Sequence, residues 1–157
     1  MKIKSIQFIL IYTLFSLINS LDNSTLSNYE DIPLNMLYGD FKIDFENKIV
    51  HGNLSYRFTP KKDGNEIILD TKNLNILKVY KINKADGADT YEPIDFYFGK
   101  IDENLGKPLI ININYLKNNS ISIRIEYDTT QKGASAQFLA KEQTFGKNHP
   151  FFSLNQH

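Results

Sequence analysis

The chain has 157 residues, and its 18 Lys and Arg residues balance its 18 Asp and Glu residues, so the formal net charge is zero. A balanced charge argues against a nucleic-acid-binding domain, which carries a strongly basic face, and an apolar content of 41% excludes a disordered tail. The absence of cysteine excludes disulfide scaffolds, Cys-type zinc fingers and cysteine nucleophiles.

The first 20 residues have the pattern of a secretory signal peptide. A short basic start, Met1 to Lys4, precedes an uncharged and almost wholly apolar run from Ile6 to Ile18. This run has the length of a signal-peptide core, about 7–15 residues, whereas a membrane-spanning helix needs about 20. We therefore predict a signal peptide over residues 1–20, a secreted or endomembrane-lumen location and no stable membrane span. A retained signal anchor is the alternative.

Three N-x-[ST] sequons are compatible with that secretory route. The predicted glycosylation sites are Asn23, Asn53 and Asn118. An asparagine-rich chain also produces such triplets by chance, so the pattern alone is weak. Asn118 is the most credible acceptor because it lies in a predicted turn.

Residues 34–45 have the alternating pattern of a β-strand. Apolar side chains first occupy even positions, at Leu34, Met36 and Tyr38, and then odd positions, at Phe41, Ile43 and Phe45. A phase slip of one residue at Gly39-Asp40 would keep both halves facing one core if a β-bulge lay there. We therefore predict a bulged strand over residues 34–45.

Further short strands follow to residue 127, separated by turn residues. They are predicted at 54–58, 66–69, 74–82, 94–98, 109–115 and 121–127, with a loop over 83–90. The last two alternate in period two and are joined by residues 117–120, which predicts a hairpin. Seven or eight short strands without a long amphipathic helix predict one all-β domain over residues 21–143, an antiparallel sandwich or curved sheet.

No catalytic set is visible in the residues themselves. His51, His149 and His157 are dispersed, and none forms an H-E-x-x-H zinc motif. The chain contains neither a G-x-S-x-G elbow nor a Gly-rich phosphate loop. The residues alone therefore predict a β domain with no catalytic residue, no metal site and no cofactor of its own.

The segment Glu142-Gln143-Thr144-Phe145-Gly146-Lys147-Asn148-His149-Pro150 resembles a stretch E-Q-T-x-G-K-x-H-P. That stretch ends the N-terminal domain of M1 zinc aminopeptidases of the leukotriene A4 hydrolase/aminopeptidase B group. Residues 44–52 resemble that group's V-D-F-x-x-K-x-x-x-G strand pair, residues 69–76 resemble its L-D-T-x-x-L-x-I block, and residues 22–30 its opening segment. The resemblance implies a saddle-shaped, mostly antiparallel β domain that supports a zinc peptidase domain in cis or in trans.

The resemblance places the family's chemistry after this part of the chain. Its zinc ligands and G-x-M-E-N stretch would follow residue 157, so residues 144–157 are expected to be the truncated start of the segment leading to the catalytic domain. Gln156 is the one expected substrate contact, as an amide facing a peptide substrate. Phe138 could be a core residue or face the missing domain, whose absence should leave a docking surface exposed. The alternative function is a stand-alone secreted β-sandwich module that binds protein or peptide.

Overall fold

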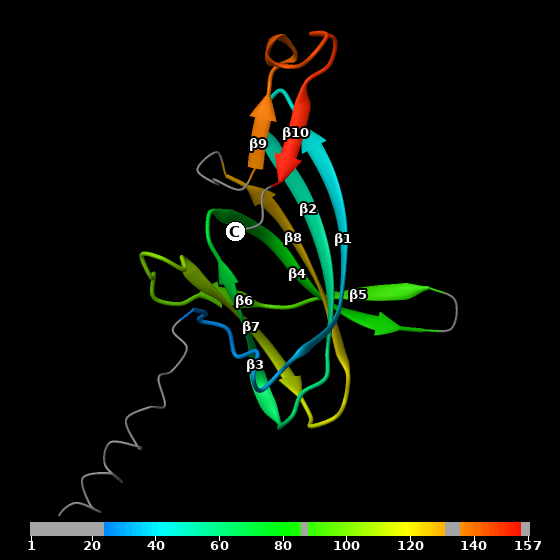
Figure 1. Cartoon of the computed structure of the whole chain (residues 1–157). Coiled ribbons are helices and arrows are strands. Elements are labelled where there is room, and N and C mark those ends of the chain that lie inside the picture. The colour runs from blue at the N-terminus through cyan, green and yellow to red at the C-terminus, as the bar shows by residue number, and fades with distance from the viewer. Residues whose placement is uncertain (1–23, 86–87, 131–135, 155–157) are drawn as a thin grey trace, which may run out of the picture.

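The structure, a computed structural model, describes residues 24–85, 88–130 and 136–154. These residues form ten strands and one 3-10 turn, η1 (Lys141–Gln143). The predicted all-β, antiparallel fold is confirmed (Figure 1). The predicted signal peptide, Asn23 and Gln156 lie outside the described residues, and no helix within the described ranges is long and apolar enough to cross a membrane.

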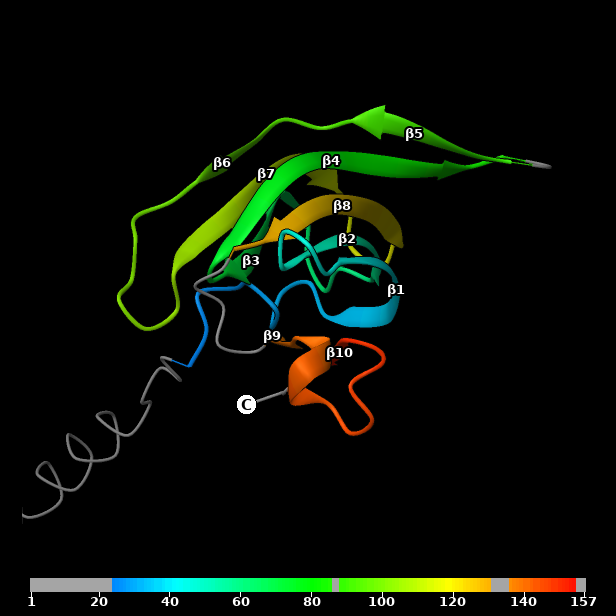
Figure 2. The same ribbon diagram turned by 90° about the horizontal axis from the view of Figure 1, so that it is seen from above.

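The larger sheet has five antiparallel strands in the order β1-β2-β8-β4-β5. Their bounds are β1 (Leu34–Asp44), β2 (Ile49–Phe58), β8 (Ile121–Thr129), β4 (Leu74–Lys84) and β5 (Asp89–Pro93). The β4–β5 hairpin projects from the body of the domain, on the right in Figures 1 and 2. Strand β1 is an edge strand, because β2 is its only partner in the sheet.

Two smaller sheets complete the fold. One has the order β3-β7-β6, formed by β3 (Gly64–Thr71), β7 (Lys107–Tyr115) and β6 (Phe96–Phe98). The other is a hairpin of β9 (Ala136–Leu139) and β10 (Phe151–Leu154). This hairpin lies beside the end of β1 and β2 in both views (Figures 1 and 2).

The core lies between the five-stranded and three-stranded sheets. Alternate residues of β7 and β8 enter it, and the two sheets contribute to one buried cluster of Ile32, Phe58, Ile67, Ile76, Val79, Leu109, Ile111, Ile113, Tyr115, Ile121, Ile123 and Ile125. The face of each sheet toward this cluster is called the inner face below. This sandwich of two antiparallel sheets follows from the period-two alternation, since each strand has one face to bury.

The predicted hairpin between residues 109–115 and 121–127 is wrong. Both strands exist, but β7 pairs with β3 and β6, whereas β8 pairs with β2 and β4. The connection over residues 116–120 therefore carries the chain from one sheet to the other. The period-two alternation correctly indicated which side chains are buried. It is equally compatible with two hydrogen-bonded strands of one sheet and with two strands of different sheets that face each other across a core.

The predicted bulge at Gly39-Asp40 is also wrong. The register of β1 on β2 runs without interruption from Met36 opposite Arg57 to Asp44 opposite Ile49, and its irregularity lies between Leu34 and Met36. Met36 and Tyr38 therefore lie on the opposite face of the sheet from Leu37, Phe41 and Ile43. The change from even to odd apolar positions in the sequence thus reflects a strand that has apolar side chains on both faces.

The segment before β1 closes the edge of β3. Asn28 Nδ2 donates to the Glu66 carbonyl at 2.9 Å, and its Oδ1 accepts from the Ile68 amide at 2.9 Å. The side chain thus pairs with β3 much as a neighbouring strand would. Covering an edge in this way removes a template for unwanted strand pairing.

Candidate functional site

The largest concentration of exposed apolar side chains lies on β1. We call the set Leu34, Met36, Leu37, Tyr38, Phe41 and Ile43 the β1 apolar surface. Each of these side chains is between 36% and 68% exposed. They lie on both faces of the strand, and exposed apolar side chains gathered in this way mark interaction surfaces in a folded protein.

The inner-face part of this surface continues the core outward. Leu37 lies opposite Tyr56, Phe41 opposite Gly52 and Ile43 opposite Val50, and Val50 is 2% exposed. The core face of β2 therefore extends onto β1, where the described residues leave it partly open. This arrangement fits the docking surface that the family resemblance implies.

The β9–β10 hairpin covers only the end of that face. Phe138 contacts Phe45 edge-to-face, with ring centroids 6.1 Å apart, and lies 5.0 Å from the Phe152 ring. Phe138 is half-buried, so it packs within this small aromatic cluster. The cluster fixes the hairpin to the turn that follows β1.

Close approach of an aromatic ring sets the packing of β2. A Cβ atom on Gly52 would lie 2.4 Å from Tyr127 Cζ, so the Tyr127 ring rests directly on the glycine backbone. The two residues are paired across β2 and β8. A glycine inside a strand often marks such a contact, and Gly52 is the glycine of the family-like strand pair.

The segment that carries the family-like motif forms an ordered turn between β9 and β10. Gln143 Oε1 accepts from the Ala140 amide at 3.0 Å, and Thr144 Oγ1 lies 2.8 Å from the carbonyl oxygens of both Lys141 and His149. Gly146 has φ +78°, a conformation that favours glycine. These motif residues therefore shape the turn, and Phe145 at its tip is fully exposed.

Two of the predicted glycosylation sites can be placed. Asn118 is exposed in the turn between β7 and β8, with φ +63°. Asn53 is half-buried in the middle of β2, opposite Asp40 on β1 and Glu126 on β8. The Asn118 side chain is thus accessible for attachment of a glycan, whereas neighbouring strands flank the Asn53 side chain on both sides.

The described residues contain no group of three or more His, Cys, Asp or Glu side chains that could hold a metal ion. His51 Nδ1 contacts Asp128 Oδ1 at 2.7 Å across β2 and β8, and His149 is exposed. The resolved pKa shifts have structural causes. Burial raises the pKa of Tyr56 to about 12, and hydrogen bonds from Asn47 lower the pKa of Asp44.

A second feature, which the sequence pattern does not reveal, lies on the outer face of the five-stranded sheet, opposite the core. A hollow of about 280 Å³ there is lined by Arg57, Arg124, Lys84, Tyr38, Tyr91 and Met36, among others. The alternation indicated that Arg57 and Arg124 point away from the core. It could not show that β2 and β8 are neighbours, and only that pairing brings the arginines together.

The sequence profile of the Peptidase M1 N-terminal domain matches residues 25–152. The chain belongs to this family. The match covers nearly every described strand, so the resemblance carried by residues 142–150 is confirmed.

The similar proteins are much longer than this chain. Leucine aminopeptidase 2 of Lodderomyces elongisporus is 38% identical over 131 residues, which are 83% of this chain and 19% of that relative. The protein of the same name from Saccharomyces cerevisiae is 30% identical over 136 residues, 84% of this chain and 19% of its own length. The structure of yeast LTA4 hydrolase in complex with bestatin superposes with a TM-score of 0.72 at 28% identity, covering 87% of this chain and 20% of that one. The chain thus spans about a fifth of the relatives that it matches.

Proposed function

We propose that this domain is the non-catalytic N-terminal domain of an LTA4 hydrolase-like M1 aminopeptidase. The observation that carries the proposal is the family match over residues 25–152 together with a relative that is named an aminopeptidase and of which the matched residues span only 19%. Peptide-bond chemistry then belongs to a catalytic domain outside residues 24–154. The role of the domain described here is to support that catalytic domain and to wall one side of its peptide pocket.

The inner-face members of the β1 apolar surface, Leu37, Phe41 and Ile43, are the proposed contact with the catalytic domain. Burying these side chains, which are now between 36% and 53% exposed, removes apolar area from water, which is the main favourable term in domain association. Zinc would be held by the catalytic domain, where it activates water for hydrolysis. Gln156 is the proposed substrate contact of this chain, since a side-chain amide can both donate to and accept from a peptide backbone.

A transcript read across codon 157 is the first test. An open frame that continues into H-E-x-x-H supports the proposal, and the encoded protein should then contain zinc and release amino-terminal leucine from a chromogenic amide. Phe41→Asp should lower the yield of active enzyme, because it places a charge on the proposed interface. The matched control is Lys42→Asp, one residue away on the opposite face of β1.

The outcomes separate the proposal from its alternative. A stop codon directly after His157 in the mature message would overturn the enzyme proposal and favour the stand-alone binding module. Equal activity losses in Phe41→Asp and Lys42→Asp would leave the aminopeptidase intact but refute β1 as its interface. Far-UV circular dichroism of both variants shows whether either loss comes from misfolding.

We also propose that the protein enters the secretory pathway, on the strength of the basic and apolar residues before Ser20 and of the exposed sequon at Asn118. Expressed in a eukaryotic host, the protein should lose mass on treatment with an endoglycosidase, and Asn118→Gln should remove that shift. Deletion of residues 2–20 should leave the protein in the cytosol. A tagged full chain that stays cytosolic with residues 1–20 intact would refute the proposal.

A further inference from the structure

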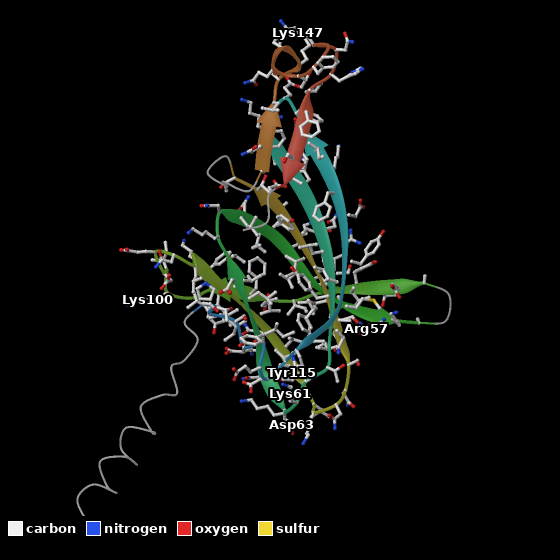
Figure 3. All side chains as sticks on the ribbon, viewed as in Figure 1. Arg57, Lys61, Asp63, Lys100, Tyr115 and Lys147 are labelled. Carbon is white, nitrogen blue, oxygen red and sulfur yellow. The ribbon has the colours of Figure 1, made fainter. Side chains whose placement is uncertain are left out.

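The hollow on the outer face crosses all five strands of the large sheet. Met36 and Tyr38 come from β1, Arg57 from β2, Arg124 from β8, Lys84 from β4 and Tyr91 from β5. Figure 3 labels Arg57, which lies near the base of the projecting β4–β5 hairpin. A neighbouring hollow of about 600 Å³ shares Arg57 and Lys84 with the first. The two together form a groove, called the outer groove below.

The outer groove is basic although the chain is neutral. Two arginines and a lysine line the first hollow against one carboxylate, Asp89, and Lys81 joins them in the second. No salt bridge involves Arg57, Arg124 or Lys84 within the described part of the chain. Asp89 lies opposite Lys84 across β4 and β5, but cations that outnumber the carboxylates around them create a local positive potential that attracts anions.

Arg124 is held in position at the centre of this groove. Its guanidinium carbon lies 5.3 Å from the Tyr91 ring centroid, and Tyr91 is braced by Tyr80 at 6.2 Å between centroids. Arg124 Nε is buried and has no hydrogen-bond partner among the described residues. A buried donor without a partner is costly, and no described carboxylate forms a salt bridge with this guanidinium group that a ligand would have to displace.

We propose that the outer groove binds an acidic peptide segment in an extended conformation. Arg57 and Arg124 are diagonal neighbours, because Arg124 pairs with Ser55 and Arg57 with Ser122. Diagonal neighbours on one sheet face lie about 7–8 Å apart, and alternate side chains of an extended peptide lie about 6.6–6.8 Å apart. Two carboxylates at alternate positions therefore match the two guanidinium groups, each of which can hold a carboxylate in a bidentate pair.

The lining favours a peptide over a bare anion. Tyr38, Tyr91 and Met36 supply apolar surface beside the cations, and a free phosphate would leave that surface unfilled. An apolar side chain further along the same face of the peptide would cover it. The outer groove lies on the opposite face from the open inner-face side chains of β1, so the inference does not depend on the aminopeptidase proposal.

The test is binding of the labelled peptide acetyl-Glu-Ala-Glu-Ala-Phe-Ala-amide to the full chain, followed by fluorescence anisotropy at low salt. Saturable binding is expected, and the peptide with Gln in place of both Glu residues should not bind. Arg57→Gln and Arg124→Gln should each weaken binding about tenfold or more. Lys42→Gln, which removes one positive charge from the same sheet face beyond Tyr38, should change it less than about twofold.

Four results would overturn the proposal. The first three are the absence of saturable binding at millimolar peptide, equal binding of the Gln peptide, and equal weakening by Lys42→Gln and Arg57→Gln. The fourth is saturable binding of inorganic phosphate without binding of the peptide. If Arg124→Gln fails to fold by circular dichroism, Arg57→Gln decides the question alone, since Arg57 and Lys42 are matched in charge.

Discussion

Replacing Gly52 with alanine tests the ring contact that joins β2 to β8. The added Cβ would lie 2.4 Å from Tyr127 Cζ, 2.5 Å from Cε1 and 2.7 Å from the hydroxyl oxygen. Distances this short require the Tyr127 ring to move, and the ring packs against the core cluster. Overpacking of this kind costs about 1–3 kcal/mol of unfolding free energy. The gain from removing a flexible glycine within a strand, roughly 0.5–1 kcal/mol, offsets only part of it.

We therefore expect Gly52→Ala to lower the free energy of unfolding by about 1–2 kcal/mol, measured by urea denaturation with an unchanged slope. The matched control is Gly39→Ala, whose Cβ would meet the exposed Phe41 ring at 2.8 Å and the end of the half-buried Leu54 side chain at 3.0 Å. Phe41 can swing into solvent, so this variant should stay within about 0.5 kcal/mol of the parent.

A double variant, Gly52→Ala with Tyr127→Leu, separates the ring contact from other causes. The smaller side chain makes room for the new methyl group, so the two changes together should cost less than the sum of their separate effects. Strict additivity, or a Gly52→Ala variant as stable as the parent, would refute the reasoning. Equal losses in Gly39→Ala and Gly52→Ala would do so as well.

Three further predictions concern single side chains. Burial raises the pKa of Tyr56 to about 12 from its ordinary 10.0. The contribution of the neutral Tyr56 side chain to the free energy of unfolding is therefore fully present below pH 10 and is lost as the pH rises toward 12. We expect the fold to lose roughly 2–3 kcal/mol of stability between pH 10 and 12, and Tyr56→Phe to remove that component in an alkaline denaturation series. The pKa of Asp44 is lowered by the hydrogen bonds from Asn47, so its stabilising effect is present above pH 3.8 and is lost as the pH falls through the lowered value. The cost of Asp44→Ala in thermal unfolding should therefore shrink in acid, and a pH-independent cost would contradict this. Asn28→Ala removes both hydrogen bonds to β3 and should cost about 1–3 kcal/mol, with faster amide exchange at Ile68 than at Ile111.

The sequence predicted which residues are buried better than which strands are neighbours. In β7 and β8 the alternation placed Ile111 and Ile123 in the core, where both are fully buried. It also suggested a hairpin, because two adjacent alternating runs satisfy the same pattern whether they pair or face each other across a core. Choosing between these requires the partners β3 and β2, which lie about 40 and 70 residues earlier in the chain.

Strands β5 and β9, which the sequence pattern did not predict, have no buried residues. None of the residues of β5 is buried, so Asp89–Pro93 carries no burial pattern to detect. Likewise β9 has only half-buried and exposed residues. These short strands are held by pairing with a neighbour and by a few aromatic contacts, and neither cause leaves a periodic signal in the sequence.

The outer groove could not be predicted for the same reason. Arg57 and Arg124 each appear in the sequence as an ordinary polar residue on the solvent side of a strand. They become neighbours only because β8 inserts between β2 and β4, which brings residues 67 positions apart onto one face.

Strand β1 contributes to both the outer groove and the proposed docking surface, one on each of its faces. Its even apolar residues, Met36 and Tyr38, line the outer groove, and its odd residues, Leu37, Phe41 and Ile43, extend the inner face. A strand with one solvent-facing side would alternate apolar with polar residues, so two apolar series in one strand indicate a requirement on each face. Aspartate placed on each face of β1 in turn separates the requirements: Tyr38→Asp should disturb peptide binding in the outer groove, whereas Phe41→Asp should disturb only domain docking. If both variants impaired both properties, β1 would act as a single structural element and the assignment of separate roles to its faces would fail.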